Sequence, residues 1–160
     1  MLDVKMICVG SLKERFWREA CDEYAKRLTT KCKFSIVEIG ECRLSSKPSN
    51  AEICKGLERE GDEILSKITQ GSRVYAMCIE GKQLSSEELA AAFSDCALGG
   101  TSSITFIIGS SYGLADKVKK RADVRLSISK MTLPHQLARV VLCEQIYRAF
   151  AINENIRYHK

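Results

Sequence analysis

The last third of the chain constrains the fold most, because two apolar strand patterns there each run directly into a polar turn. Residues 104–108 (ITFII) form an apolar run, and the glycine-containing segment 109–114 (GSSYGL) follows at once. Residues 126–136 (LSISKMTLPHQ) repeat this arrangement with a Ser/Lys/Thr turn, and a long apolar helix pattern comes next. In open α/β sheets, ligands bind at the carboxyl ends of the strands, where backbone groups are free. The two turns therefore predict a small-molecule pocket, which favours an enzyme or a cofactor-binding domain over a passive scaffold.

Strand and helix patterns alternate along the whole chain. Apolar or alternating runs predict strands at residues 4–9, 34–39, 74–79, 104–108 and 124–129. Helical spacing or an acidic first turn predicts helices at residues 14–28, 51–68, 85–98 and 135–152, with a short basic helix at 113–122. Residues 41–50 are polar and are predicted to form a mobile loop. Such alternation over 160 residues predicts one α/β domain, spanning residues 1–160, with a mostly parallel sheet.

Composition narrows the class of protein further. The eight cysteines include no C-x-x-C pair, which indicates reduced, mostly buried thiols in a cytoplasmic protein. With only two histidines and no ligand spacing, we expect no metal site. No apolar run reaches the roughly 20 residues of a membrane helix, and the N-terminus has the pattern of a first strand, not of a signal peptide. The glycine-rich, nucleophile-elbow and zinc-helix motifs of common nucleotide-binding proteins and hydrolases are absent.

The positive charge of the chain is concentrated in one segment. The net charge is +5, and residues 117–130 carry six cationic side chains against the single carboxylate of Asp123. A basic segment beside a candidate pocket indicates a polyanionic partner such as nucleic acid. The alternative is a solvated helix face with no partner.

The final helix pattern is apolar on two sides, which requires two surfaces to pack against. One side carries Leu137, Val140, Val141, Tyr147 and Ala151, and the other carries Leu142, Ile146, Ala149 and Phe150. One side can cover the sheet and leave the other for a second subunit, so we predict a homodimer. The alternative is a helix that is simply central to a monomer.

Several residues of the last helix and the tail are candidates for chemistry. His135 follows a proline at the start of the helix, where it is either a functional residue or a capping and packing residue. Arg139, Glu144 and Arg148 lie on an otherwise apolar helix, where charges pair with each other or reach a ligand. The tail, residues 157–160 (RYHK), offers cations for phosphate and rings for stacking on a base.

Taken together, these motifs resemble the ribosomal RNA large subunit methyltransferase H family, a minimal branch of the SPOUT methyltransferases. The matching segments are 9–13 (VGSLK), 108–114 (IGSSYGL), 127–136 (SISKMTLPHQ), 139–150 (RVVLCEQIYRAF) and 158–160 (YHK). The resemblance spans the whole chain in order and length.

The resemblance implies a fold, a reaction and partners. The fold would be an α/β sheet with helices on both faces and a deep C-terminal trefoil knot, which pattern analysis alone could not predict. The enzyme would be a cytoplasmic homodimer that uses S-adenosylmethionine to methylate N3 of a pseudouridine, position 1915 of 23S rRNA in the family, in assembled ribosomes. Two alternatives remain open: a non-catalytic ribosome- or RNA-binding module, and a SPOUT tRNA methyltransferase.

The resemblance also assigns cofactor positions. The residues concerned are Met77, Gly109, Ile128, Ser129, Lys130, Met131, Thr132 and Leu133. The chain departs from the family at two positions, each directly after one of these residues. Cys78 follows Met77 where an acidic residue is common, and Ser110 follows Gly109 where a second glycine is common.

Methylation at N3 also requires a proton acceptor and groups that bind the RNA. His135 is the candidate proton acceptor, and Arg139, Arg148 and Arg157 are candidates to bind phosphate or a developing oxyanion. Tyr158 and His159 would position the flipped base, from the same subunit or from its partner. Docking on RNA is assigned to Lys117, Lys119, Lys120, Arg121, Arg157 and Lys160.

Overall fold

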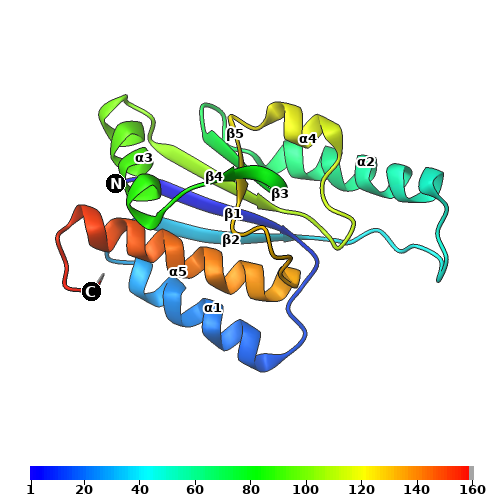
Figure 1. Ribbon diagram of the computed structural model, residues 1–160, viewed down its shortest axis with the longest axis horizontal. Helices are drawn as coiled ribbons and strands as arrows, with labels where there is room; N and C mark the ends of the chain where they lie inside the picture. Colours follow the sequence, from blue (N-terminus) through cyan, green and yellow to red (C-terminus); the bar gives the residue numbers. More distant parts are fainter. Residues whose placement is uncertain (159–160) are drawn as a thin grey trace.

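The structure, a computed structural model, describes residues 1–158 and contains a five-stranded sheet in the order β2-β1-β4-β3-β5 (Figure 1). All four neighbouring strand pairs are parallel, which confirms the predicted α/β class. The strands are β1 (Asp3–Val9), β2 (Lys33–Ile39), β3 (Arg73–Gln83), β4 (Ser103–Ile108) and β5 (Val124–Ser127). The helices are α1 (Arg15–Leu28), α2 (Asn50–Lys67), α3 (Ser86–Leu98), α4 (Asp116–Arg121) and α5 (His135–Asn153).

Helices cover both faces of the sheet. In Figure 1, α2 and α4 lie on one side of the strands, while α1 and α5 lie on the other. Successive side chains of a strand point to opposite faces, and β1 shows this directly. Met6 and Cys8 join a cluster with residues of α1, α3 and α5, whereas Ile7 and Val9 join one with residues of α2 and α4. The central strands β1 and β4 are therefore buried on both faces, as parallel strands usually are.

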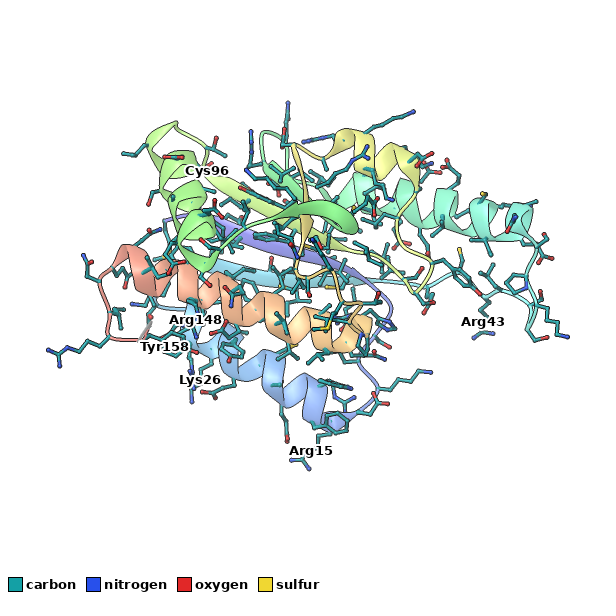
Figure 2. All side chains as sticks on the ribbon, viewed as in Figure 1. Arg15, Lys26, Arg43, Cys96, Arg148 and Tyr158 are labelled. Atoms are coloured by element: carbon teal, nitrogen blue, oxygen red, sulfur yellow. The ribbon has the colours of Figure 1, made fainter. Side chains whose placement is uncertain are left out.

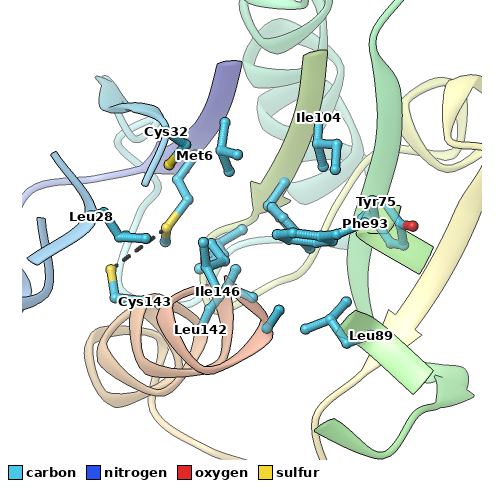
Figure 3. Packing of buried hydrophobic residues seen from close by; sticks show 14 of the residues in the cluster. Met6, Leu28, Cys32, Tyr75, Leu89, Phe93, Ile104, Leu142, Cys143 and Ile146 are labelled. Carbon is cyan, nitrogen blue, oxygen red and sulfur yellow. Dashed lines mark hydrogen bonds between the residues drawn. The ribbon is translucent and has the colours of Figure 1, made fainter. Parts of the chain in front are cut away.

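The larger core cluster lies between the sheet and α5 (Figure 3). Phe106 of β4 stacks on Tyr75 of β3 with ring centroids 4.9 Å apart. The ring of Phe93 of α3 also contacts the Phe106 ring, at a centroid distance of 6.1 Å. Leu142 and Ile146 of α5 are buried against this group. Each such side chain contributes roughly 1.5–3 kcal/mol on burial, so α5 is fixed firmly along the sheet.

Two helices begin with complete capping boxes. Ser49 accepts from the Glu52 backbone N–H, and Glu52 accepts in return from the Ser49 N–H, at the start of α2. Ser85 and Glu88 do the same for α3. The predicted start of this helix at Ser85 is therefore confirmed.

None of the described helices is long and apolar enough to cross a membrane.

The third strand is longer than its sequence pattern predicted. It continues to Gln83 because residues 78–81 form a bulge, so that Met77 and Lys82 both pair with Leu126 of β5. Gly81 allows the bulge to lie this close to the backbone of β5. A Cβ atom at Gly81 would lie 2.6 Å from the carbonyl carbon of Leu126, too close for any other residue without movement of the backbone.

Two other predicted boundaries were wrong by a few residues. The helix α4 begins at Asp116, not at residue 113, because the chain from Ser110 to Gly113 forms a tight turn. The strand β5 ends at Ser127, not at residue 129, because the next residues turn toward α5.

Candidate active site

A cavity of about 680 Å³ lies at the carboxyl ends of β3, β4 and β5, in the range typical of small-molecule sites. We call it the knot-turn cavity, after the knot that the family resemblance implies for this part of the chain. Its walls come from residues 77–80, 108–114, 126–129 and 131–135, with Lys119 and Ala138. Both polar turns of the last third of the chain therefore meet at one place, as the sequence predicted.

Most of the predicted cofactor residues line this cavity. Met77, Gly109, Ile128 and Ser129 do so, as do residues 131–133. Lys130 is not among the lining residues, and it is exposed to solvent. The two departures from the family pattern, Cys78 and Ser110, both line the wall.

Gly109 is required by the turn itself. A Cβ atom there would lie 2.4 Å from the carbonyl oxygen of Gly113 and 2.9 Å from Cδ2 of Leu114. The turn is closed by a hydrogen bond from the Gly113 N–H to the Ser110 carbonyl at 2.9 Å, and Gly113 has a φ of 87°. Close backbone packing therefore explains Gly109 before any ligand is considered.

The turn after β5 is organised by its own hydroxyl groups. The Ser127 hydroxyl donates to the Ser129 carbonyl at 3.0 Å, and the Met131 N–H donates to the Ser129 hydroxyl at 3.0 Å. Ile128 and Met131 remain exposed, by 37% and 77%. The turn thus lines the cavity with backbone groups and apolar side chains, which suits a ligand with an apolar body and a polar edge.

An ion pair that the sequence did not predict lies on the cavity wall. The bulge of β3 brings Glu80 within 2.6 Å of Lys119. This contact is the main reason that the pKa of Glu80 lies below its usual value and that of Lys119 above it. Burial, and then the Glu80 charge, raises the pKa of the Cys78 thiol, so this thiol is neutral at physiological pH.

The candidate catalytic residues fall into two separate groups. His135 lines the knot-turn cavity, one turn of α5 before Arg139. Arg139 is 2% exposed and donates through Nη2 to the Gly10 carbonyl at 3.1 Å, while its Nη1 lies 3.4 Å from a carboxylate oxygen of Glu38. Arg139 therefore contacts the ends of β1 and β2, and it is not among the lining residues of the knot-turn cavity.

Arg148 and Tyr158 form the second group, near the end of α5 (Figure 2). The Arg148 guanidinium lies 4.8 Å from the Tyr158 ring centroid and donates to Glu144 at 2.6 Å. Partial burial is the largest of the causes that raise the pKa of Tyr158 to about 12, and the neighbours Tyr24 and Glu144 add to it. Thirteen residues of helix place Arg148 about 20 Å from His135 along the axis. Within one chain, these residues do not meet at the cavity.

The remaining tail residues are only partly described. Arg157 is exposed. His159 and Lys160 lie outside the described residues.

Several cations of the basic segment are paired with carboxylates, which its composition alone did not indicate. Lys117 contacts Glu58 at 2.9 Å and Asp62 at 2.5 Å, both on α2. Arg121 lies 3.8 Å from Asp123. Lys120, like Arg125 and Lys130 of the same segment, is exposed. Local carboxylates therefore offset part of the predicted RNA-binding charge.

No group of three or more His, Cys, Asp or Glu side chains within residues 1–158 could hold a metal ion.

Comparisons with known proteins point to one family. Residues 2–159 match the sequence profile described as "Predicted SPOUT methyltransferase". The ribosomal RNA large subunit methyltransferases H of Ligilactobacillus salivarius and Lactobacillus acidophilus are each 50% identical over 159 residues, covering 99% of this chain and 100% of the relative.

Solved structures with the same fold are more distant in sequence. A tRNA (m1G37) methyltransferase from Aquifex aeolicus superposes with a TM-score of 0.55 at 14% identity, covering 91% of this chain and 69% of that protein. A probable methylase family protein from Haemophilus influenzae superposes with a TM-score of 0.53 at 12% identity, covering 100% and 72%. At this level of identity the likeness concerns the fold alone.

Proposed function

The chain belongs to the ribosomal RNA large subunit methyltransferase H family of SPOUT methyltransferases and is an enzyme, and we propose that it methylates N3 of pseudouridine 1915 in 23S rRNA. We propose further that its donor is S-adenosylmethionine and that its substrate is the assembled ribosome in the cytoplasm. The observation that carries the proposal is the knot-turn cavity, whose walls include residues of two segments by which the chain resembles this family, 108–114 and 127–136.

The residues of the cavity fit S-adenosylmethionine. A volume of about 680 Å³ accommodates a ligand of this size, and the two turns offer backbone groups for its polar edges. Met77, Gly109, residues 128–129 and residues 131–133 would hold it. The neutral Cys78 thiol supplies a weak donor where the family usually has a carboxylate. When bound, the cofactor supplies an electrophilic methyl group on a sulfonium.

The residues of the chain align and deprotonate the acceptor. Alignment of the reacting atoms supplies much of the rate in a displacement of this kind. The cofactor would supply the methyl group that replaces the N3 proton, and that proton would pass to a base, for which His135 is the candidate at the edge of the cavity. Arg139 is already paired with Glu38, so we assign it a positioning role. The exposed Arg157 remains a candidate for phosphate contact.

We propose that the enzyme acts as a homodimer with a deep C-terminal trefoil knot, as membership of the family implies. The separation of about 20 Å between His135 and Arg148 supports this proposal. In a dimer, Arg148, Tyr158 and His159 of the partner subunit would complete the site, and a flipped base would stack on the tyrosine ring.

The test uses ribosomes from cells that lack this methylation. They are incubated with the purified protein and S-adenosylmethionine labelled in its methyl group, beside free rRNA and tRNA, and the label is mapped by mass spectrometry. We expect label on one pseudouridine, in assembled ribosomes only. Label on tRNA would establish a tRNA methyltransferase instead, and no label on any RNA from a protein that binds S-adenosylmethionine would overturn the proposal.

A further inference from the structure

A second cavity opens at the carboxyl ends of β1 and β2, beside the knot-turn cavity. Its volume is about 770 Å³, and we call it the β1–β2 cavity. It is lined by Gly10, Ser11, Lys13, Glu14, residues 38–41, Arg43, His135 and Gln136. His135 lines both cavities, so they adjoin at the first residue of α5. The segment 9–13, by which the chain resembles its family, enters the wall of this second cavity and has no role in the first.

A carboxylate on the wall of the β1–β2 cavity is held by a buried cation. The Glu38 side chain is 44% exposed, and its carboxylate lies 3.4 Å from Nη1 of Arg139, which is itself 2% exposed. Nη2 of Arg139 also donates to the Gly10 carbonyl on the same wall. Nε of Arg139 has no hydrogen-bond partner within residues 1–158. Glu38 thus combines a fixed position at the end of a strand with access to the cavity, as a residue for recognition requires.

We propose that the β1–β2 cavity receives the acceptor nucleoside, and that Glu38 accepts a hydrogen bond from N1–H of its base. This inference rests on the proposed function. In pseudouridine the sugar is attached through carbon, so the ring keeps an N1–H donor that uridine lacks. N1 and N3 flank the same carbonyl carbon. A base bound through N1 can therefore present N3 to His135, where the two cavities meet. Glu38 selects pseudouridine over uridine, and Lys13 and Arg43 supply cations for the flanking phosphates.

The experiment compares two kinds of ribosome that lack the methyl group. One kind carries pseudouridine at the target position, and the other, from cells without the enzyme that forms this pseudouridine, carries uridine. The ratio of kcat/KM for the two substrates is measured for the wild type and for Glu38→Gln. We expect the wild type to prefer pseudouridine and the variant to lose roughly 10-fold of this preference, because a charge-assisted hydrogen bond is replaced by a neutral one that is about half as strong. The decrease in kcat/KM should occur with the pseudouridine-containing ribosomes and not with the uridine-containing ones.

Two variants make the test specific. Glu14→Gln removes a carboxylate of the same cavity that makes no side-chain capping bond at the start of α1, and it should keep the wild-type ratio. Glu38→Asp keeps a charge opposite Arg139 and withdraws it by one methylene. It should fold and still lose part of the preference, which covers the case in which Glu38→Gln does not fold. The affinity of each variant for S-adenosylmethionine, measured by calorimetry, should be unchanged.

The outcomes separate this inference from the proposed function. A wild type that methylates both ribosomes with a strong preference, and Glu38 variants that keep it, would overturn the role of Glu38 and leave the function intact. A wild type that methylates neither ribosome would overturn both. An equal loss of preference in Glu14→Gln would overturn Glu38 as the selective residue.

Discussion

The residue that most directly joins fold and site is Gly109. A side chain there would meet the Gly113 carbonyl oxygen at 2.4 Å, so Gly109→Ala must displace backbone. We expect a loss of about 1–3 kcal/mol in the free energy of unfolding, as for other overpacked sites, together with weaker binding of S-adenosylmethionine. Chemical denaturation and calorimetry measure the two effects. Gly40→Ala is the matched control, because no atom lies within 4 Å of the added Cβ, and it should change stability by less than about 0.5 kcal/mol.

Glu60 is a second residue whose environment makes a prediction. It is 5% exposed on α2, and its Oε2 has no hydrogen-bond partner within the described residues. Burial is the main cause that raises the pKa of Glu60, and the charge of Glu41 adds to it. Hydrogen bonds from the Cys42 backbone and the Ser110 hydroxyl oppose the shift. The folded state therefore holds this proton to a higher pH than the unfolded chain does, and stability falls as pH rises through that interval.

Glu60→Gln removes the cost of this buried charge. At pH 7 to 8 we expect the variant to be more stable by about 1 kcal/mol, because a neutral amide can accept the same two hydrogen bonds. The gain should shrink as pH falls and reach its minimum well below the ordinary carboxyl pKa of 4.5, where the wild-type side chain is protonated in both the folded and the unfolded state. Urea denaturation at several pH values measures it. A gain that does not depend on pH would show that the charge of Glu60 is not its cause.

At the scale of elements, α4 shows how packing redistributes charge. Lys117 of α4 already faces two carboxylates of α2, whereas Lys120 is exposed. We expect Lys120→Glu to weaken ribosome binding about threefold or more and to reduce its salt dependence, as the loss of one phosphate contact does. Lys117→Glu should instead lower the stability of the fold, because it places a third carboxylate beside Glu58 and Asp62, and it should change ribosome affinity less. Binding measured over a range of salt concentrations would decide, and equal effects of both variants on affinity would contradict this assignment.

Local patterns predicted the elements but not their long-range contacts. The alternation of strands and helices, the start of α3 and the two turns of the knot-turn cavity followed from periodicity, capping and glycine placement. The bulge at residues 78–81 did not, because it exists only opposite β5. Neither the Lys119–Glu80 pair nor the Arg139–Glu38 pair could be read from the sequence, since each joins residues far apart in the chain. The summed charge of a segment likewise says nothing of the carboxylates that fold against it.

At the scale of the whole molecule, the proposed dimer requires that one side of α5 contact the partner subunit. Leu142 and Ile146 are buried in the core, whereas Leu137 and Val141 are only partly buried. We expect Val141→Asp to shift the protein toward monomers and to lower methylation at least tenfold, because each site would lose its partner's tail. Sedimentation and the methylation assay measure both. Leu98→Asp, at an 87% exposed position on α3, should change neither. A Val141→Asp protein that remains a fully active dimer would remove this helix from the interface.

The strand order also dictates when the enzyme can become active during its own synthesis. β1 emerges first and finds β2 soon afterwards, but its other neighbour, β4, pairs Ser103 with Asp3 and is made about a hundred residues later. Until then, one edge of β1 remains open, which is a hazard for a nascent chain and a reason for chaperones to engage it. The walls of the knot-turn cavity arrive later still, with residues 126–135. A protein that we propose to modify ribosomes is therefore inert for most of its passage through the ribosome that makes it.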